Sequence, residues 1–239
     1  MSCKNPSAFK WRHFHGEVIL QCVRWYCKYG ISYRDLEEMM AERGLSIDHT
    51  SIYRWVQYYA PELKKRLDWY NQRYSRRWHL DETYVKVKVK GEWKYLYRAI
   101  DENGNTIDFY LSHQRNTKAD KRFLSKLIKN NPSCDVSVIN TDKNPAYSQA
   151  IKELKREGNL ALHVSHLQIK YRNNRLESDH GKLKRLINPV LGFQSMKTAY
   201  ATIKGFEVLG MFRKGQFNKW MVGNQNEISF INQLFQVYG

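Results

Sequence analysis

The sequence lacks the features of a membrane-bound or secreted protein. Its 239 residues contain no apolar run near the roughly 20 residues that a membrane-spanning helix requires. Its beginning, Met1-Ser2-Cys3-Lys4-Asn5-Pro6, has no apolar stretch of about 7–15 residues, which a signal peptide would carry. We therefore expect a cytoplasmic protein that has no membrane partner.

Cysteine is also scarce, and its spacing argues against two kinds of site. The four cysteines form no CxxC pair, so a structural zinc site is not expected. Without a secretion signal, we interpret them as reduced thiols of the core and not as disulfide partners. The cysteines are Cys3, Cys22, Cys27 and Cys134.

Negative charge is in short supply. The chain has 40 Lys and Arg against 23 Asp and Glu, which gives a net charge of +17 and an isoelectric point near 9.7. The excess runs through the chain and is not confined to a tail, so it predicts a polyanionic partner, of which nucleic acid is the usual one. A protein of the membrane surface, or one that is merely basic, has the same composition. Charge does not tell which nucleic acid is bound or what is done to it.

The residue pattern changes twice along the chain. Residues 1–60 show the apolar spacings of helices, whereas residues 78–190 show strands first and then strands alternating with helices. The stretch 61–77 between them is basic and aromatic with little periodicity, which predicts a linker that also touches DNA backbone. Residues 191–239 are predicted to form a C-terminal helical extension.

Three short helices are predicted in the first segment. Ser32 and Asp35 fit a capping box at the start of the second helix, Asp48 can cap the third, and Pro61 is expected to end it. A Gly-containing turn before the third helix is typical of a helix-turn-helix, although a plain three-helix bundle shares this pattern. In a helix-turn-helix, early residues of the third helix enter the major groove. The candidates for DNA contact are His49, Thr50, Ser51 and Arg54.

The order of elements from residue 78 predicts a mixed α/β sheet of the ribonuclease H type. The order is βββαβαβα, and its first three strands are joined by short turns into an antiparallel meander. Strands are predicted at 78–87, 92–100, 106–111, 136–140 and 162–167, and helices at 118–130, 146–157 and 173–187. In this topology the first and fourth strands are central neighbours. Their ends are expected to bring Asp81 and Asp142 together.

A third acid, Glu177, lies on the last of these helices. At 100° per residue, Lys184 lies seven positions on and about 20° away, so the two share one side. A different stripe is predicted to pack on the sheet and consists of Leu176, Leu183 and Ile187. Gly181 sits between Glu177 and Lys184, where it hints at close approach by a ligand or a backbone.

Three converging carboxylates repel one another, and a divalent cation relieves that repulsion. Mg²⁺ prefers oxygen ligands and suits a few carboxylates together with phosphate oxygens of a substrate. Two ions can bracket an in-line displacement at phosphorus. The pattern therefore predicts two Mg²⁺ ions, with Mn²⁺ as a substitute, held by Asp81, Asp142 and Glu177. Lys184 is expected to hold a flanking phosphate as a point charge.

Each acid has another interpretation. Glu82 is a rival of Asp81, and because adjacent strand residues point to opposite faces, at most one of the two is expected to fit. The sequence around Asp142 is also typical of a turn, which is an alternative to a metal-binding role. Asp179 lies close to Glu177 in the sequence. The pattern by itself leaves these readings open.

Several residues and motifs of the chain resemble those of a known family. Asp81, Asp142 and Glu177, with 34 residues between the last two and Lys184 seven positions after Glu177, resemble the DDE transposase arrangement. From about residue 13 to 215, the chain is similar to the IS-six family of bacterial insertion-sequence transposases. The similar words are Ser51-Ile52-Tyr53-Arg54-Trp55-Val56-Gln57, Asp81-Glu82-Thr83-Tyr84, Tyr95-Leu96-Tyr97-Arg98-Ala99-Ile100-Asp101, Asn140-Thr141-Asp142-Lys143 and Asp179-His180-Gly181-Lys182-Leu183-Lys184-Arg185.

The resemblance implies an activity. Water would first free the 3′-hydroxyl ends of the terminal inverted repeats of a mobile element, and those ends would then attack target DNA. It also implies replicative cointegrate formation and a homodimer or higher multimer that acts on double-stranded DNA. The basic residues after the third acid are further candidates for DNA contact, namely Lys182, Lys184 and Arg185.

Three other functions fit part of the sequence. A DNA-binding repressor accounts for the helix-turn-helix and the charge but not for the spaced acids. A metal-dependent nuclease that cuts without joining would have the same active site, because only the attacking hydroxyl differs. A decayed transposase copy would keep the family words, although its intact acids argue against decay.

Overall fold

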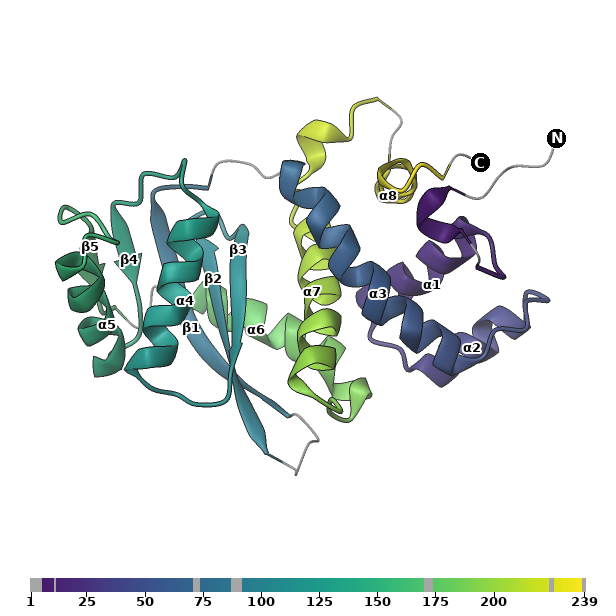
Figure 1. Ribbon diagram of the computed structural model, residues 1–239, viewed down its shortest axis with the longest axis horizontal. Coiled ribbons are helices and arrows are strands. Elements are labelled where there is room, and N and C mark those ends of the chain that lie inside the picture. The colour runs from purple at the N-terminus through teal and green to yellow at the C-terminus, as the bar shows by residue number, and fades with distance from the viewer. Residues whose placement is uncertain are drawn as a thin grey trace. The chain divides into compact units, whose positions relative to one another are not determined.

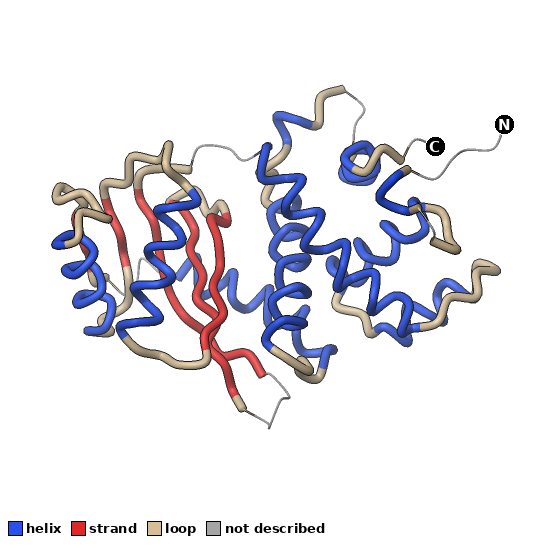
Figure 2. The backbone as a smooth tube through the Cα atoms, viewed as in Figure 1, coloured by secondary structure: helices blue, strands red, loops and turns tan. Residues whose placement is uncertain are grey.

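A five-stranded mixed sheet and a separate group of helices make up the chain (Figures 1 and 2). The computed structural model describes residues 6–10, 12–70, 74–86, 92–169, 174–223 and 226–237. Within these ranges, none of the helices has the length and apolar character needed to span a membrane. The residues fall into two compact units, each with a core of its own.

The sheet belongs to the unit formed by Arg73–Lys184 and Gly192–Met196, called the sheet unit below. Its strand order is β3-β2-β1-β4-β5, in which β1, β2 and β3 form an antiparallel meander while β4 and β5 run parallel to β1. The strands are β1 (Arg77–Lys86), β2 (Trp93–Asp101), β3 (Thr106–Ser112), β4 (Val138–Asn140) and β5 (Ser165–Leu167). The predicted ribonuclease H-like fold with β1 beside β4 is confirmed.

Helices lie on both faces of this sheet (Figure 1). They are α4 (Thr117–Asn130), α5 (Pro145–Arg156) and α6 (Asn174–Ile187), close to the predicted bounds. α4 and α5 pack on the face that carries Trp78, Leu80 and Tyr97, where they bury an apolar core with Phe123 and Tyr147. α6 lies on the opposite face. Alternation along β1 therefore points Glu82 toward α4 and α5, and Asp81 toward α6.

The strands of the central pair differ greatly in length, and this difference makes room for a site. β4 pairs with β1 only at Arg77, Trp78 and His79. Beyond His79, β1 continues through Lys86 with a partner on the β2 side alone among the described strands. The chain leaving β4 can therefore bring its next residues alongside the middle of β1.

The second unit is helical and is formed by Met1–Gln72, Arg185–Leu191 and Lys197–Gly239; we call it the helical unit. Its helices are α1 (Gly16–Tyr29), α2 (Tyr33–Ala41), α3 (His49–Leu67), α7 (Met196–Arg213) and α8 (Glu227–Leu234). The predicted capping box is present, since Ser32 accepts from the Asp35 backbone and Asp35 accepts from the Ser32 backbone. Asp48 caps α3 by accepting from the backbone N–H of Thr50 at 2.7 Å.

The prediction that Pro61 ends the third helix is wrong. α3 continues through Pro61 to Leu67, so the first part of the predicted linker 61–77 is helical. A proline inside a helix costs about 3 kcal/mol. The added turns bury Leu63 and Leu67 almost completely, which contributes roughly 1.5–3 kcal/mol for each side chain. Burial therefore outweighs the lost hydrogen bond.

The C-terminal helices pack within the helical unit and do not form a separate layer. α7 buries residues on nearly every side, among them Ala199, Ile203 and Phe206. The side-chain amide of Gln57 in α3 donates to Thr202 in α7 at 2.8 Å. The described residues up to Tyr70 and those after Met196 thus belong to one compact unit. A helix that is buried on most of its sides, as α7 is, must be enclosed by other helices.

Gly205 in α7 is expected to be required for this packing. A Cβ there would lie 2.5 Å from Cys27 Sγ and 2.9 Å from Ala60 Cβ, so Gly205→Ala should lower the free energy of unfolding by roughly 1–3 kcal/mol. Gly210→Ala in the same helix meets no atom within 4 Å and should instead add about 1 kcal/mol through helix propensity. Thermal unfolding followed by circular dichroism compares the two. Equal shifts in Tm would contradict the close approach.

Candidate functional site

Acidic side chains meet where β1 runs past the end of β4. Asp81 lies in the middle of β1, and Asp142 lies two residues beyond β4. Each offers a carboxylate oxygen to a cluster in which all ligand atoms lie within 4.8 Å of one another. The topology therefore brings Asp81 and Asp142 together, as expected from the sequence.

The third member of this cluster is Glu82, the sequence rival of Asp81, of which at most one was expected to fit. The structure instead brings both carboxylates close to Asp142. Neighbouring strand residues do point to opposite faces, but β4 has ended here, so no described strand separates the two faces on that side of β1. Glu82 and Asp81 can both reach the open edge that Asp142 occupies. We call Asp81, Glu82 and Asp142 the acid cluster.

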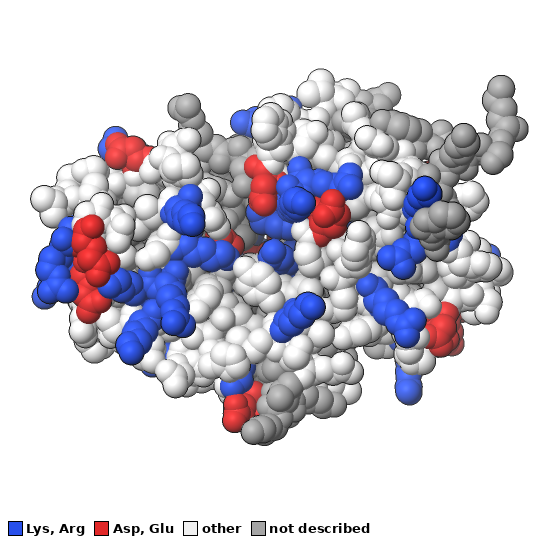
Figure 3. All heavy atoms as spheres, viewed as in Figure 1, with Lys and Arg blue, Asp and Glu red and all other residues white. Residues whose placement is uncertain are grey.

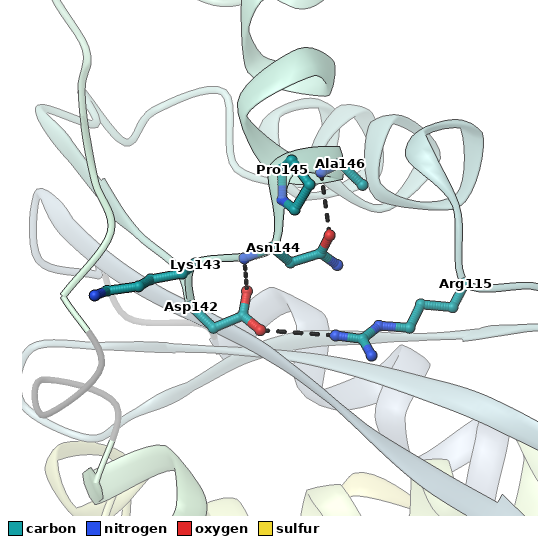
Figure 4. Close-up of a pocket in the computed structure, with 6 residues that line it drawn as sticks. All are labelled: Arg115, Asp142, Lys143, Asn144, Pro145 and Ala146. Atoms are coloured by element: carbon teal, nitrogen blue, oxygen red, sulfur yellow. Dashed lines mark hydrogen bonds and ion pairs between the residues drawn. The ribbon is translucent and has the colours of Figure 1, made fainter.

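Arg115 balances part of the negative charge. It comes from the loop between β3 and α4, and its guanidinium forms an ion pair with Glu82 and lies 3.7 Å from an Asp142 carboxylate oxygen. The same guanidinium lines an open pocket with Asp142 and the start of α5 (Figure 4). Asp142 is held in place because its other oxygen accepts from the backbone N–H of Asn144 at 3.0 Å. No sequence pattern singled out Arg115.

Glu82 is the most enclosed member of the acid cluster. Only 4% of its side chain is exposed, and one of its oxygens accepts from the Tyr147 hydroxyl at 3.0 Å. Burial raises its pKa, while the positive charge of Arg115 opposes that rise. Glu82 is thus a carboxylate with partners of its own.

Asp81, in contrast to Glu82, has little around it to offset its negative charge. Burial, with added repulsion from the three carboxylates of Glu82, Asp142 and Glu177, raises the pKa of Asp81 to about 7. The imidazole Nδ1 of His180 lies 3.8 Å from the carboxylate Oδ2 of Asp81. Negative charge on Asp81 is therefore poorly offset by the surrounding protein, which is the condition that a bound divalent cation relieves.

Glu177, the third predicted acid, lies in the first turn of α6 and is exposed. It is not part of the acid cluster, but its charge acts on Asp81. Lys184 is exposed as well, whereas Leu176 and Leu183 are buried, so the predicted division of the helix into two sides is confirmed. A Cβ on Gly181 would meet nothing within 4 Å. Close approach by another part of the described chain therefore does not explain this glycine.

A buried ion pair ties α6 to the sheet. The Arg98 guanidinium donates to the Asp179 carboxylate at 2.7 Å, and the two residues are only 3% and 7% exposed. Arg98 lies directly opposite Asp81 on β2. The pair therefore fixes the helix that carries Glu177 next to the strand that carries Asp81. In the sequence, Arg98 was recognisable as the single charged residue of the otherwise apolar strand segment Tyr95–Ile100.

Another acid lies beneath the acid cluster. Asp120, in α4, is fully buried. Burial raises its pKa to about 6, an effect that the charge of Glu82 increases and the Tyr97 hydroxyl opposes. Sequence analysis missed Asp120 because its neighbours in α4 show an ordinary amphipathic pattern. It touches no open surface, so its influence is electrostatic.

The residues predicted to contact DNA lie on two elements. In α3, Arg54 is exposed, while the His49 imidazole lies 2.9 Å from a Glu37 carboxylate oxygen and the Thr50 hydroxyl bonds to Asp48. Ser51 is half-buried. In α6, the exposed basic side chains are those of Lys182, Lys184 and Arg185. Figure 3 shows Lys and Arg spread over the visible face and not gathered in one patch.

Comparison with known proteins identifies relatives over most of the chain. The model of the IS240-type transposase family, described as a DDE domain, matches residues 75–216. The transposases of the element IS431mec and of IS257 in transposon Tn4003, both from Staphylococcus aureus, are 35% identical over 209 residues, which is 87% of this chain and 90% of theirs. Among solved structures, the magnesium-bound integrase catalytic core of HTLV-2 is 21% identical, with a TM-score of 0.42 over 57% of this chain and 85% of that one.

Asp120 is expected to destabilise the fold at neutral pH. Its folded-state pKa of about 6 lies above the ordinary value of 3.8, so the folded protein holds a proton that the unfolded chain releases between these pH values. The cost therefore grows as pH rises from about 4 to 6 and then stays. Asp120→Asn should raise the free energy of unfolding by roughly 1–3 kcal/mol at pH 8 and change it little at pH 4.

Unfolding of the sheet unit, followed by tryptophan fluorescence in urea at both pH values, measures this effect. Asp135→Asn is the matched control, because 65% of that side chain is exposed and its ion pair with Arg76 lies at the surface. A lower stability of Asp120→Asn at pH 8 would show that the charged carboxylate is favoured where it lies.

Proposed function

Because the chain belongs to the IS-six family of DDE transposases, we propose that it cuts the terminal inverted repeats of an insertion sequence and joins the freed 3′ ends to target DNA. Membership makes it a polynucleotidyl transferase that acts on DNA. The ends that are cut, the order of cutting and joining, and the residues that carry these steps are proposed here, with support from the acids that this fold gathers.

The observation that carries the proposal is the convergence of Asp81 and Asp142 in the acid cluster, together with the raised pKa of Asp81. The cluster lies inside the segment 75–216 that matches the DDE domain. A repressor would gain nothing from partly buried acids that repel one another, and such a cluster costs stability unless a cation is bound. The arrangement therefore favours an enzyme that uses a metal over a protein that only binds DNA.

The donors at the site fit Mg²⁺. All are carboxylate oxygens, which are the ligands that Mg²⁺ prefers, and the site is open to solvent and substrate through the pocket beside Asp142. We assign Asp81, Asp142 and Glu177 as the residues that hold two Mg²⁺ ions, with Mn²⁺ as a substitute. When bound, the ions would activate an oxygen nucleophile and stabilise the leaving oxygen at phosphorus.

Glu82 is assigned a supporting role and not that of a ligand. Its carboxylate already pairs with Arg115 and accepts from Tyr147, whereas the charge of Asp81 is offset only in part, since burial and its neighbouring carboxylates raise its pKa. Exchanging satisfied contacts for a metal costs more than adding a metal to a carboxylate that has fewer of them. Glu82 instead holds Arg115, whose guanidinium lies 3.7 Å from Asp142 at the pocket.

DNA would be bound by basic and polar side chains of both units. Lys184 shares the exposed side of α6 with Glu177 and is suited to hold a phosphate next to the scissile one, with Lys182 and Arg185 along the same helix. In the helical unit, the predicted reading residues are His49, Thr50, Ser51 and Arg54. Among them the guanidinium of Arg54 is the group able to bind a guanine by two hydrogen bonds.

We also propose that the protein joins DNA ends, forms cointegrates by replication and acts as a multimer. Strand transfer uses the same groups as hydrolysis and differs only in the attacking hydroxyl, so one site serves both steps. Replicative cointegrate formation and assembly as a homodimer or higher multimer are supported by the family resemblance. The assay below separates joining from cutting alone.

Each assigned metal ligand is expected to be essential for both steps. Asp81→Asn, Asp142→Asn and Glu177→Gln should each lower the rate of strand transfer of end-containing DNA in Mg²⁺ by about 100-fold or more, since a metal-site contribution amounts to several kcal/mol. Cleavage and joining products are separated on a denaturing gel. Glu102→Gln is the control, an exposed acid at the other end of the sheet, and should retain the full rate.

Three results would change the proposal. Wild-type rates for all three variants would remove the metal site. Loss of activity in Glu82→Gln but not in Asp81→Asn would transfer the ligand role to Glu82. Cutting that persists while joining is absent in the unaltered protein would make the chain a nuclease.

Arg54 is expected to read bases. Arg54→Ala should weaken binding to inverted-repeat DNA by roughly 5–100-fold, the effect of about 1–3 kcal/mol for one bidentate contact, while binding to unrelated DNA changes little. Fluorescence anisotropy at two salt concentrations measures both affinities. Lys65→Ala, an exposed basic residue in the last turn of the same helix, should weaken both alike. Equal losses for Arg54→Ala would place its guanidinium on phosphate.

A further inference from the structure

Aromatic side chains line the outer part of the β1–β2 hairpin. Tyr84 and Trp93 are 52% and 57% exposed, and Tyr95 between them is partly buried against the core. The rings of Tyr84 and Tyr95 lie with their centroids 5.1 Å apart. We call Tyr84, Tyr95 and Trp93 the aromatic strip.

The strip shares a face of the sheet with a member of the acid cluster. Glu82 pairs with Tyr97 and Tyr84 pairs with Tyr95 across the two strands, and Trp93 lies two residues from Tyr95. Because side chains alternate along a strand, all five point to the same face. The strip therefore continues the row that begins at Glu82 and leads away from the acids along the hairpin.

The strip also begins next to the residue that balances the acids. Tyr84 lies two residues from Glu82 on the same face of β1, and Glu82 forms an ion pair with Arg115. Arg115 and Asp142 line the same pocket. The strip and the Glu82–Arg115 pair beside this pocket thus lie on one face of the sheet, so a strand of nucleic acid that enters the pocket has the strip next to it.

Packing explains why this row is covered at one end and open at the other. α4 and α5 bury Tyr97 completely, but they do not extend over the outer hairpin, which runs beyond the end of α4 (Figure 2). Large rings left in water at Tyr84 and Trp93 add nothing to the core. Exposed aromatic rings next to a site are typical of a binding surface.

The chemistry of the strip suits unpaired nucleotides. Bases in a duplex stack on one another and present only their edges, whereas a base freed from its partner offers a flat face to an aromatic ring. Stacking tolerates any base, so the strip would act on all sequences. The net charge of +17 favours a polyanion over a second copy of this basic chain.

We propose that the aromatic strip binds unpaired nucleotides of the DNA strand whose backbone reaches the acid cluster, by stacking their bases on Tyr84 and Trp93. The inference rests on the proposed function, because it takes DNA as the substrate of the acid cluster. It adds a specificity: DNA that is frayed or single-stranded beside the reacting phosphate is held more tightly than fully paired DNA. Tyr84 and Trp93 are therefore binding residues and not catalytic ones.

The test uses the full chain without divalent metal, so that binding is measured in the absence of cutting. The probes are a blunt duplex and the same duplex with a short single-stranded 3′ extension that contains 2-aminopurine, whose fluorescence is quenched on stacking. The unaltered protein should quench the probe and bind the extended duplex roughly 5–100-fold more tightly than the blunt one. Tyr84→Thr and Trp93→Thr, which keep strand propensity, should remove the quenching and most of this preference.

Three control variants accompany the test. Trp93→Phe retains a ring and should retain the quenching. Tyr29→Ala removes an aromatic side chain of equal exposure, 57%, from the helical unit and should leave the preference unchanged. Asp81→Asn should stop strand transfer but not the quenching, so a failure of the strip and a failure of the proposed function give different results.

The proposal is overturned if the unaltered protein neither quenches the probe nor prefers the extended duplex. It is also overturned if both Thr variants, folded by circular dichroism, quench as well as the unaltered chain. Light scattering gives a further outcome. If the Thr variants dissociate a multimer while the preference persists, the strip is a contact between copies of this chain and not a nucleotide site.

Discussion

Repulsion among Asp81, Glu82 and Asp142 is the constraint that the rest of the sheet unit must satisfy. Their oxygens lie within 4.8 Å of one another, and their partial burial limits how far water weakens the interaction. A group of charges like this persists only where cations, protons or hydrogen bonds offset it. The protein offsets it unevenly, since Arg115 pairs with Glu82 while Asp81 keeps a pKa of about 7.

This uneven compensation separates the two faces of β1 by function. On the face covered by α4 and α5, Glu82 is neutralised and fixed. On the other face, the charge of Asp81 stays available, and α6 brings Glu177 within its electrostatic reach. The Arg98–Asp179 pair holds α6 there, and losing either partner would leave an uncompensated charge in the interior. The position of the third acid thus depends on a buried ion pair that takes no part in the chemistry proposed.

The unequal lengths of β1 and β4 have two consequences for the surface. Because β4 stops opposite His79, the chain that follows it can place Asp142 beside the middle of β1. Because β1 and β2 continue further, their outer residues leave the cover of the helices and expose Tyr84 and Trp93. One difference in strand length therefore yields both the proposed catalytic site and the surface proposed to bind unpaired bases next to it.

Features that depend on residues close in sequence were predictable from the sequence, as were strand order and the meeting of Asp81 with Asp142. Helix caps, turns and alternation are local, and the βββαβαβα order leaves few ways to arrange a sheet. Only the tertiary structure decided the rest. Helix α3 passes through Pro61 because distant side chains bury its last turns, Glu82 joins the acids because β4 ends early, and Arg115 reaches them from a loop. Each of these depends on contacts between residues far apart in the chain, whose energies no local pattern contains.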